Sequence, residues 1–153
     1  MEKLNQWLTL FANVGVIAGI AFLGFEIRQN TQMIESQTRD SITEKQIAVF
    51  EWWATSTENN RIRTLGDNLE LDANSPEAGQ YSWMIAGNLR LWENEWYQYK
   101  RGLFEEEEFE PRLKIWKRLV NRPGIIYVWE NGQREAYSPE FAALIDSLIE
   151  HPQ

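Results

Sequence analysis

The chain of 153 residues contains no cysteine. This absence excludes disulfide bonds, thiolate catalysis, cysteine-ligated zinc and the acylation that anchors lipoproteins. Histidine occurs once, at His151, the third residue from the C-terminus, where a frayed polar tail is expected. Catalytic triads that use histidine and histidine-rich metal sites are therefore not expected.

Basic residues are outnumbered, since 15 Lys and Arg stand against 23 Asp and Glu and give a formal net charge of −8. An acidic domain repels phosphate backbones, so nucleic acid is not expected as a partner. Glycine-rich phosphate loops, nucleophile elbows, HExxH pairs and Glu-x-x-His pairs are also missing. No metal or cofactor is expected, and the acidic run Glu105–Glu108 is interpreted as the first turn of a helix.

One long uncharged run is present, Trp7–Phe25, of about 19 residues. A helix of this length spans roughly 28 Å, close to the thickness of a bilayer's hydrocarbon core. We expect residues 1–6 to form an N-terminal tail and residues 7–25 to form a single helix that crosses the lipid bilayer. Two alternatives are a cleaved signal peptide, for which the start MEKLNQ is barely basic, and a buried core helix, for which the run is long.

Gly15 and Gly19 form a GxxxG pair within this span. Two glycines four residues apart make a flat strip at which two helices can approach closely, so a homodimer through this face is one hypothesis. Glycine is also common in membrane helices, in which case the pair is incidental. Lys3 before the span and Arg28 and Arg39 after it slightly favour a cytoplasmic C-terminal domain.

Residues 26–54 contain no glycine and no proline, so nothing in them ends a helix. Their apolar positions Ile27, Ile34, Ile42, Val49 and Trp53 lie on one helical face. We therefore expect the span to continue as one long helix to about Ala54. Its polar middle favours a solvated stalk over a coiled-coil-like contact.

Residues 55–153 are expected to form a small all-α soluble domain. A polar break over 55–60 precedes a short helix over 61–65 that ends at Gly66, and a loop follows over 67–74. Ser75-Pro76-Glu77 and Ser138-Pro139-Glu140 each predict the start of a helix, with serine as the N-cap.

The helix from Pro76 to about Arg101 has the clearest pattern, and Gly102 is its expected C-cap. One apolar stripe extends along it, typical of a core face with a ligand cleft as the alternative: Tyr81, Ile85, Leu89, Trp92, Trp96, Tyr99 and Leu103. The next helix ends at Val120 and either begins near Pro111 or kinks there. Residues 125–131 form a strand or a short helix, and the helix is favoured because no partner strand is evident. A last helix ends at His151-Pro152.

Three short motifs, distributed over most of the chain, resemble those of a known family: Ile27–Thr31, Trp96–Leu103, and Ser138–Phe141 with Ile145-Asp146. The chain resembles the uncharacterised bacterial proteins that carry one N-terminal membrane helix and a small helical domain. We expect a single-pass location in the bacterial inner membrane, and the resemblance implies this architecture alone. It brings no activity, substrate or cofactor.

Eight tryptophans are many for this length, and they serve either as large packing units or as the walls of an apolar pocket. Glu95 precedes Trp96 of the stripe and is expected to be partly buried, with Tyr99 and Arg90 as its nearest polar groups. Trp92 and Trp96 would complete a ligand site. A buried carboxylate of this kind is more often structural than catalytic, so no catalytic residue is assigned and an enzyme is not favoured.

Two functions of different classes follow. The first is a membrane-anchored interaction module of unknown biochemical role that binds a protein partner or a second copy of itself. The second is a small-molecule binding or catalytic domain with a tryptophan-lined pocket around Glu95. The second requires a pocket of several hundred Å³ that includes Glu95, and the first requires an exposed apolar patch or a dimer seam.

Overall fold

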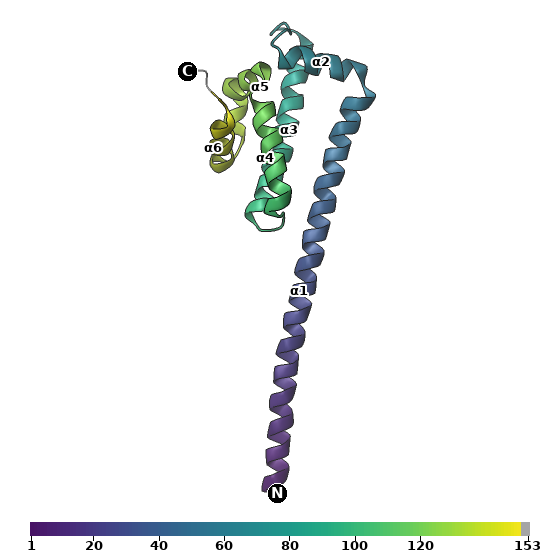
Figure 1. The fold of residues 1–153 in the computed structure, drawn as a ribbon, viewed down its shortest axis with the longest axis vertical. Coiled ribbons are helices and arrows are strands. Elements are labelled where there is room, and N and C mark those ends of the chain that lie inside the picture. The colour runs from purple at the N-terminus through teal and green to yellow at the C-terminus, as the bar shows by residue number, and fades with distance from the viewer. Residues whose placement is uncertain (151–153) are drawn as a thin grey trace. The chain divides into compact units, whose positions relative to one another are not determined.

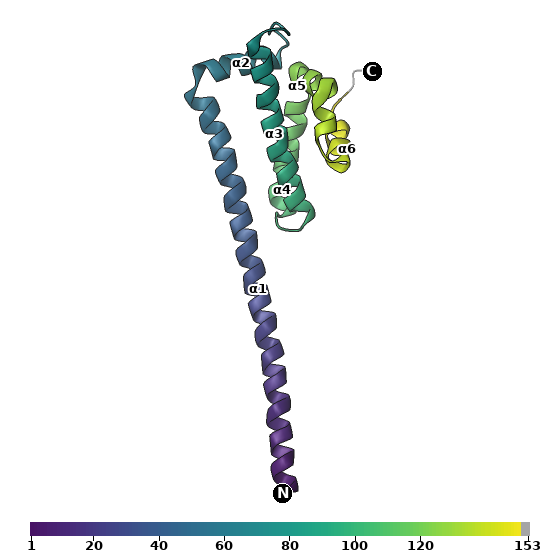
Figure 2. The same cartoon turned by 180° about the vertical axis from the view of Figure 1, so that it is seen from behind.

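The computed structural model describes residues 1–150, so the prediction for His151 and Pro152 lies outside the described residues. No strand occurs in that part of the chain, and the predicted all-α class is confirmed (Figures 1 and 2). The helices are α1 (Glu2–Thr55), α2 (Thr57–Asp67), α3 (Pro76–Lys100), α4 (Glu106–Val120), α5 (Pro123–Val128) and α6 (Pro139–Leu148). A π-helical turn, η1 (Trp129–Gln133), and a 3₁₀ turn, η2 (Arg134–Ala136), connect the last two helices.

The chain divides into two units, Met1–Gln37 and Thr38–Gln153. The first unit is helical and contains the expected span, which is long and apolar enough to cross a membrane and has none of its apolar window buried. Within it the hydroxyl of Thr9 donates a hydrogen bond to the carbonyl oxygen of Asn5 at 2.9 Å. The hydroxyl is thereby satisfied by the helix itself, which makes it tolerable in an apolar environment.

Helix α1 ends at Thr55, as expected, but the predicted polar break over 55–60 is wrong. Ser56 alone separates α1 from α2, because its side-chain oxygen accepts a hydrogen bond from the backbone N–H of Asn59 at 3.1 Å. This cap starts a new helix at Thr57, and α2 is longer than the predicted 61–65 helix.

The predicted ends of α3 are both confirmed. Ser75 caps its start and accepts a hydrogen bond from the backbone N–H of Ala78 at 3.2 Å. At its end Gly102 has a φ of +70°, and the N–H of Leu103 bonds to the carbonyl of Gln98 at 3.0 Å. This pattern is a Schellman motif, which glycine favours because it adopts the left-handed conformation without strain.

The remaining helices differ in detail from their predicted forms. Helix α4 begins at Glu106 and continues through Pro111, so Pro111 marks no boundary. Residues 125–131 belong to α5 and η1, which confirms the favoured helix over the strand. Helix α6 begins at Pro139, but Ser138 makes no side-chain cap. Its backbone N–H instead donates to the Glu93 carboxylate at 2.8 Å.

The core of the second unit is built from the apolar stripe of α3 and from aromatic side chains of α4 and α6. Trp116 lies at its centre, stacked on Trp92 with ring centroids 5.2 Å apart and edge-on to Phe109 at 5.3 Å. Ile42 of α1 is also buried, and the Arg39 guanidinium pairs with Glu108 of α4 at 2.7 Å. The end of α1 is therefore part of this unit, packed against α3 and α4.

Candidate ligand-binding site

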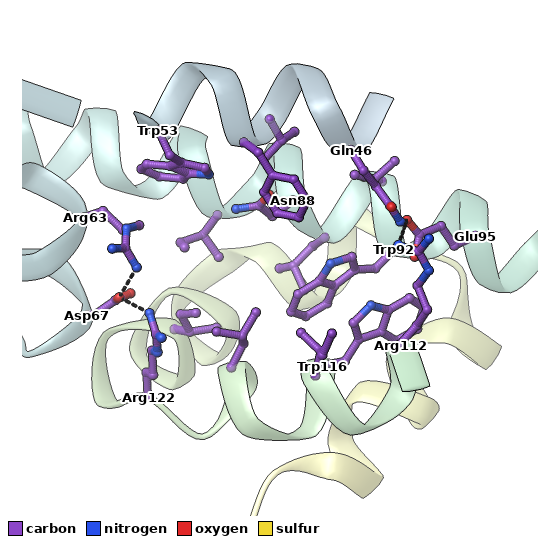
Figure 3. Close-up of a pocket in the computed structure, with 18 residues that line it drawn as sticks. Gln46, Trp53, Arg63, Asp67, Asn88, Trp92, Glu95, Arg112, Trp116 and Arg122 are labelled. Atoms are coloured by element: carbon purple, nitrogen blue, oxygen red, sulfur yellow. Dashed lines mark hydrogen bonds and ion pairs between the residues drawn. The ribbon is translucent and has the colours of Figure 1, made fainter. Parts of the chain in front are cut away.

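A cavity of about 340 Å³ lies within the second unit, where the end of α1 faces α2, α3, α4 and the start of α5 (Figure 3). We call it the Glu95 cavity. Most of its wall is apolar. Its lining side chains are Gln46, Val49, Phe50, Trp53, Arg63, Asp67, Ile85, Asn88, Leu89, Leu91, Trp92, Glu95, Arg112, Ile115, Trp116, Leu119, Arg122 and Ile125.

Glu95 reaches the cavity because it lies three residues after Trp92 on α3, next to the apolar stripe. Only 1% of Glu95 is exposed. Its Oε1 accepts a hydrogen bond from the side-chain amide of Gln46 on α1 and lies 3.7 Å from Nη1 of Arg112 on α4. Its Oε2 is buried and has no hydrogen-bond donor within reach.

Burial raises the pKa of Glu95, and the hydrogen bond from Gln46 and the charge of Arg112 oppose this only in part. The carboxylate is therefore incompletely compensated by the protein. A buried oxygen without a donor carries a desolvation cost of about 1–3 kcal/mol, which a donor on a bound molecule would remove.

A second polar group lies at the other end of the cavity and is fully paired (Figure 3). The Asp67 carboxylate accepts hydrogen bonds from the hydroxyl of Tyr81 at 2.9 Å and from Arg122, and it lies 3.5 Å from Arg63. Burial, followed by the charge of Asp67, raises the pKa of Tyr81. These contacts join α2, α3 and the start of α5, so Asp67 has a structural role.

Aromatic rings form the wall beside Glu95. Trp92 and Trp116 stack with an interplanar angle of 13°, and both line the cavity. Trp53 of α1 lines it further along, with the guanidinium of Arg63 5.5 Å from the centre of its ring. The tryptophans therefore do both things that the sequence suggests: they pack against one another and they leave a cavity beside them.

The structure separates the residues that the sequence grouped as one site. Glu95 and Trp92 line the Glu95 cavity. Arg90 and Trp96 line a separate, open groove of about 820 Å³ between α1 and α3. Tyr99 is not a partner of Glu95, because its ring stacks on Phe109 with centroids 4.2 Å apart.

Arg90 is also engaged elsewhere. It pairs with Glu93, donates a hydrogen bond to the carbonyl of Ala136 at 2.9 Å and lies over the ring of Tyr137. It therefore anchors η2 to α3 and does not contact Glu95. The true partners of Glu95, Gln46 and Arg112, come from other helices and have no signal in the local sequence.

Comparisons with family models, with curated proteins and with solved structures find no match to the chain. The function of the site is therefore inferred from its geometry alone. Among residues 1–150 there is also no group of three or more side chains that could hold a metal ion.

Proposed function

We propose that this protein is a membrane-anchored domain that binds a small, largely apolar molecule in the Glu95 cavity. The observation that carries the proposal is Oε2 of Glu95, a buried carboxylate oxygen without a donor at the edge of an apolar cavity. Natural proteins seldom leave such an atom unpaired, so a partner for it is expected. The ligand would bring a hydrogen-bond donor to this oxygen and place its apolar body along the remaining wall.

The dimensions of the cavity support this function. Its volume of about 340 Å³ lies within the range of small-molecule sites, which are mostly apolar with a few polar groups that fix orientation. At about 30 Å³ for each water-sized group, it has room for roughly 11 such groups. Binding is favoured over catalysis, because the other carboxylate that lines the cavity, Asp67, is held by Arg122 and Tyr81.

The full chain in phosphatidylcholine nanodiscs provides the test, with radiolabelled octan-1-ol as the probe in equilibrium dialysis. Val49→Trp would fill the cavity from α1, and Ile47→Trp on the exposed side of the same helix is the matched control. Wild type and Ile47→Trp should each bind about one more equivalent of octan-1-ol than Val49→Trp binds. The uptake by Val49→Trp nanodiscs measures the octan-1-ol that dissolves in the lipid. Equal uptake by all three folded proteins, for octan-1-ol and for its amine analogue octylamine alike, would refute the function.

The proposed location is the bacterial inner membrane, with residues 7–25 as a single span and the second unit in the cytoplasm. The apolar window of α1 and the excess of arginine after the span support this arrangement. Retention in membranes after an alkaline carbonate wash is expected. Release into the wash would contradict the anchor.

A second candidate function is an interaction module that pairs with a second copy or with another protein. It is favoured by three large apolar side chains that are exposed near the end of α1: Ile47, Phe50 and Trp52. Gly15 and Gly19 leave a further open strip in the first unit, since an added Cβ at either would meet nothing within 4 Å. Crosslinking in membranes should give a dimer that Gly15→Ile with Gly19→Ile removes, whereas an unchanged monomer would reject self-association through this strip.

A further inference from the structure

The head group of the ligand follows from the charges around the cavity. We infer that the Glu95 cavity takes a small cationic amphiphile, a protonated amine on an apolar body of about ten non-hydrogen atoms. This inference rests on the proposed function and deepens it, because it names the chemical class that the cavity would select.

The unpaired acceptor lies at the Glu95 end of the cavity. Asp67 at one end is already matched by Arg63, Arg122 and the hydroxyl of Tyr81. Glu95 at the other end keeps Oε2 without a donor. A ligand head that binds here must donate, and an ammonium group brings three donors together with a positive charge. Hydrogen bonds that involve charged groups are roughly twice as strong as neutral ones.

An aromatic wall lies beside the carboxylate of Glu95. Trp92 and Trp116 both line the cavity, and Figure 3 shows their indoles next to the group formed by Gln46, Glu95 and Arg112. An indole face attracts a cation and also packs well against methylene groups. A carboxylate flanked by indoles therefore suits an ammonium group attached to an alkyl body better than it suits an alcohol.

The positive charge of Arg112 opposes the binding of a cationic ligand at Glu95. Its guanidinium lies 3.7 Å from Oε1 of Glu95, keeps 27% of its side chain exposed and lies over the ring of Phe104. Solvent therefore screens part of its repulsion toward a second cation. The chain as a whole carries a formal charge of −8, which attracts cations and repels carboxylates from solution.

The expected membrane span adds a source for such a ligand. Only residues 26–37 lie between the expected span and the second unit. Twelve residues extend at most about 40 Å, which limits the distance between the end of the expected span and the start of the second unit at Thr38. Amphiphiles that partition into lipid are thereby concentrated near the start of the second unit.

The experiment compares heads on one body: octylamine, octan-1-ol and octanoate, each with the full chain in phosphatidylcholine nanodiscs. Binding is measured by equilibrium dialysis, with Val49→Trp subtracted to remove uptake by lipid. At pH 7 octylamine should bind about tenfold more tightly than octan-1-ol, and octanoate more weakly than either. Glu95→Gln should reduce octylamine binding about tenfold and change octan-1-ol binding by less than about threefold.

A pH series on the wild-type chain gives a second readout that requires no variant to fold. The groups facing Glu95 are the side-chain amide of Gln46 from α1 and the guanidinium of Arg112 from α4. Octylamine affinity should therefore fall as the pH is lowered and Glu95 becomes protonated, while octan-1-ol affinity stays level. If octan-1-ol or octanoate binds as tightly as octylamine, the cationic class is wrong and the cavity still binds; if no probe binds above Val49→Trp, both proposals fail.

Discussion

At the scale of single residues, two carboxylates of α3 stand in contrast. Glu95 is buried, and this burial raises its pKa against the opposing effects of Gln46 and Arg112. Glu93 is only half-buried: burial would raise its pKa, but hydrogen bonds from Ser138 and Arg90 outweigh it and lower the pKa. Opposite shifts on one helix predict opposite dependences of stability on pH.

Glu95→Gln should become more stabilising as the pH rises. Because the folded-state pKa of Glu95 is above its ordinary value of 4.5, the stability of the neutral form is fully present below pH 4.5 and is lost as the pH rises through the folded-state pKa. Glutamine has no such loss. Thermal unfolding of both proteins is measured between pH 4 and pH 8. The melting temperature of the variant, relative to that of the wild type, should increase as the pH rises.

Glu93→Gln is the matched control for that series. Since the folded-state pKa of Glu93 is below 4.5, its contribution is present above pH 4.5 and is lost as the pH falls through the folded-state value. This variant should therefore lose stability relative to the wild type as the pH rises to 4.5, and above pH 4.5 the difference should stay level. Parallel curves for the two variants would show that the environments of the carboxylates are misassigned.

Asp67→Ala should be strongly destabilising. The substitution removes the acceptor of the Tyr81 hydroxyl and the anion between Arg63 and Arg122. Polar groups left without partners in a buried position cost about 1–3 kcal/mol each. Urea unfolding should show a loss of about 2–3 kcal/mol. The control is Glu58→Ala, which removes the exposed ion pair of Glu58 with Arg61. If its urea midpoint shifts as far as that of Asp67→Ala, the structural role of Asp67 is contradicted.

At the scale of elements, α2 and α5 approach each other through two glycines. A Cβ added at Gly124 would lie 1.8 Å from the carbonyl oxygen of Gly66, and a Cβ at Gly66 would lie 2.3 Å from the ring of Tyr81. Both helices keep this spacing only without side chains at the contact. The contact also places Asp67 and Arg122 side by side at one end of the Glu95 cavity.

Gly124→Ala should therefore force α2 and α5 apart. We expect a loss of about 1–3 kcal/mol or more in the free energy of unfolding, measured by urea denaturation, because neither backbone can yield freely. Gly79→Ala on α3 is the control, since its Cβ meets nothing within 4 Å. That change should stabilise by about 0.5–1 kcal/mol. A Gly124→Ala protein as stable as the control would contradict the close approach.

The elements that the sequence predicts well are those with local signals. Spacings of three and four residues define the stripe of α3, and Ser75, Pro76 and Gly102 define its ends. Pro111 is misleading in this respect, because α4 continues through it. The pairing of Gln46 with Glu95 joins residues 49 positions apart, and only the packing of α1 on α3 creates it. The same packing separates Arg90 and Trp96 from the cavity, which no local pattern reveals.

At the scale of the whole molecule, a candidate membrane span is joined to the unit that contains the Glu95 cavity. The orientation can be tested directly, because the chain has no native cysteine. Asn74→Cys, in the exposed loop between α2 and α3, should resist a membrane-impermeant maleimide in intact bacterial spheroplasts and react after lysis. Glu2→Cys, before the span, should react without lysis. The reverse pattern would place the second unit outside the cytoplasm.

Ligand binding in the Glu95 cavity can be tested by photolabelling. An octylamine that carries a diazirine is irradiated with the full chain in nanodiscs, and the labelled residues are mapped by mass spectrometry. Labels are expected on the cavity segments of α1, α3 and α4, around residues 46–53, 88–95 and 112–119. Excess octylamine should prevent these labels, and Val49→Trp should lack them. Labels confined to residues 7–25, with the cavity segments unmodified, would contradict binding in the Glu95 cavity.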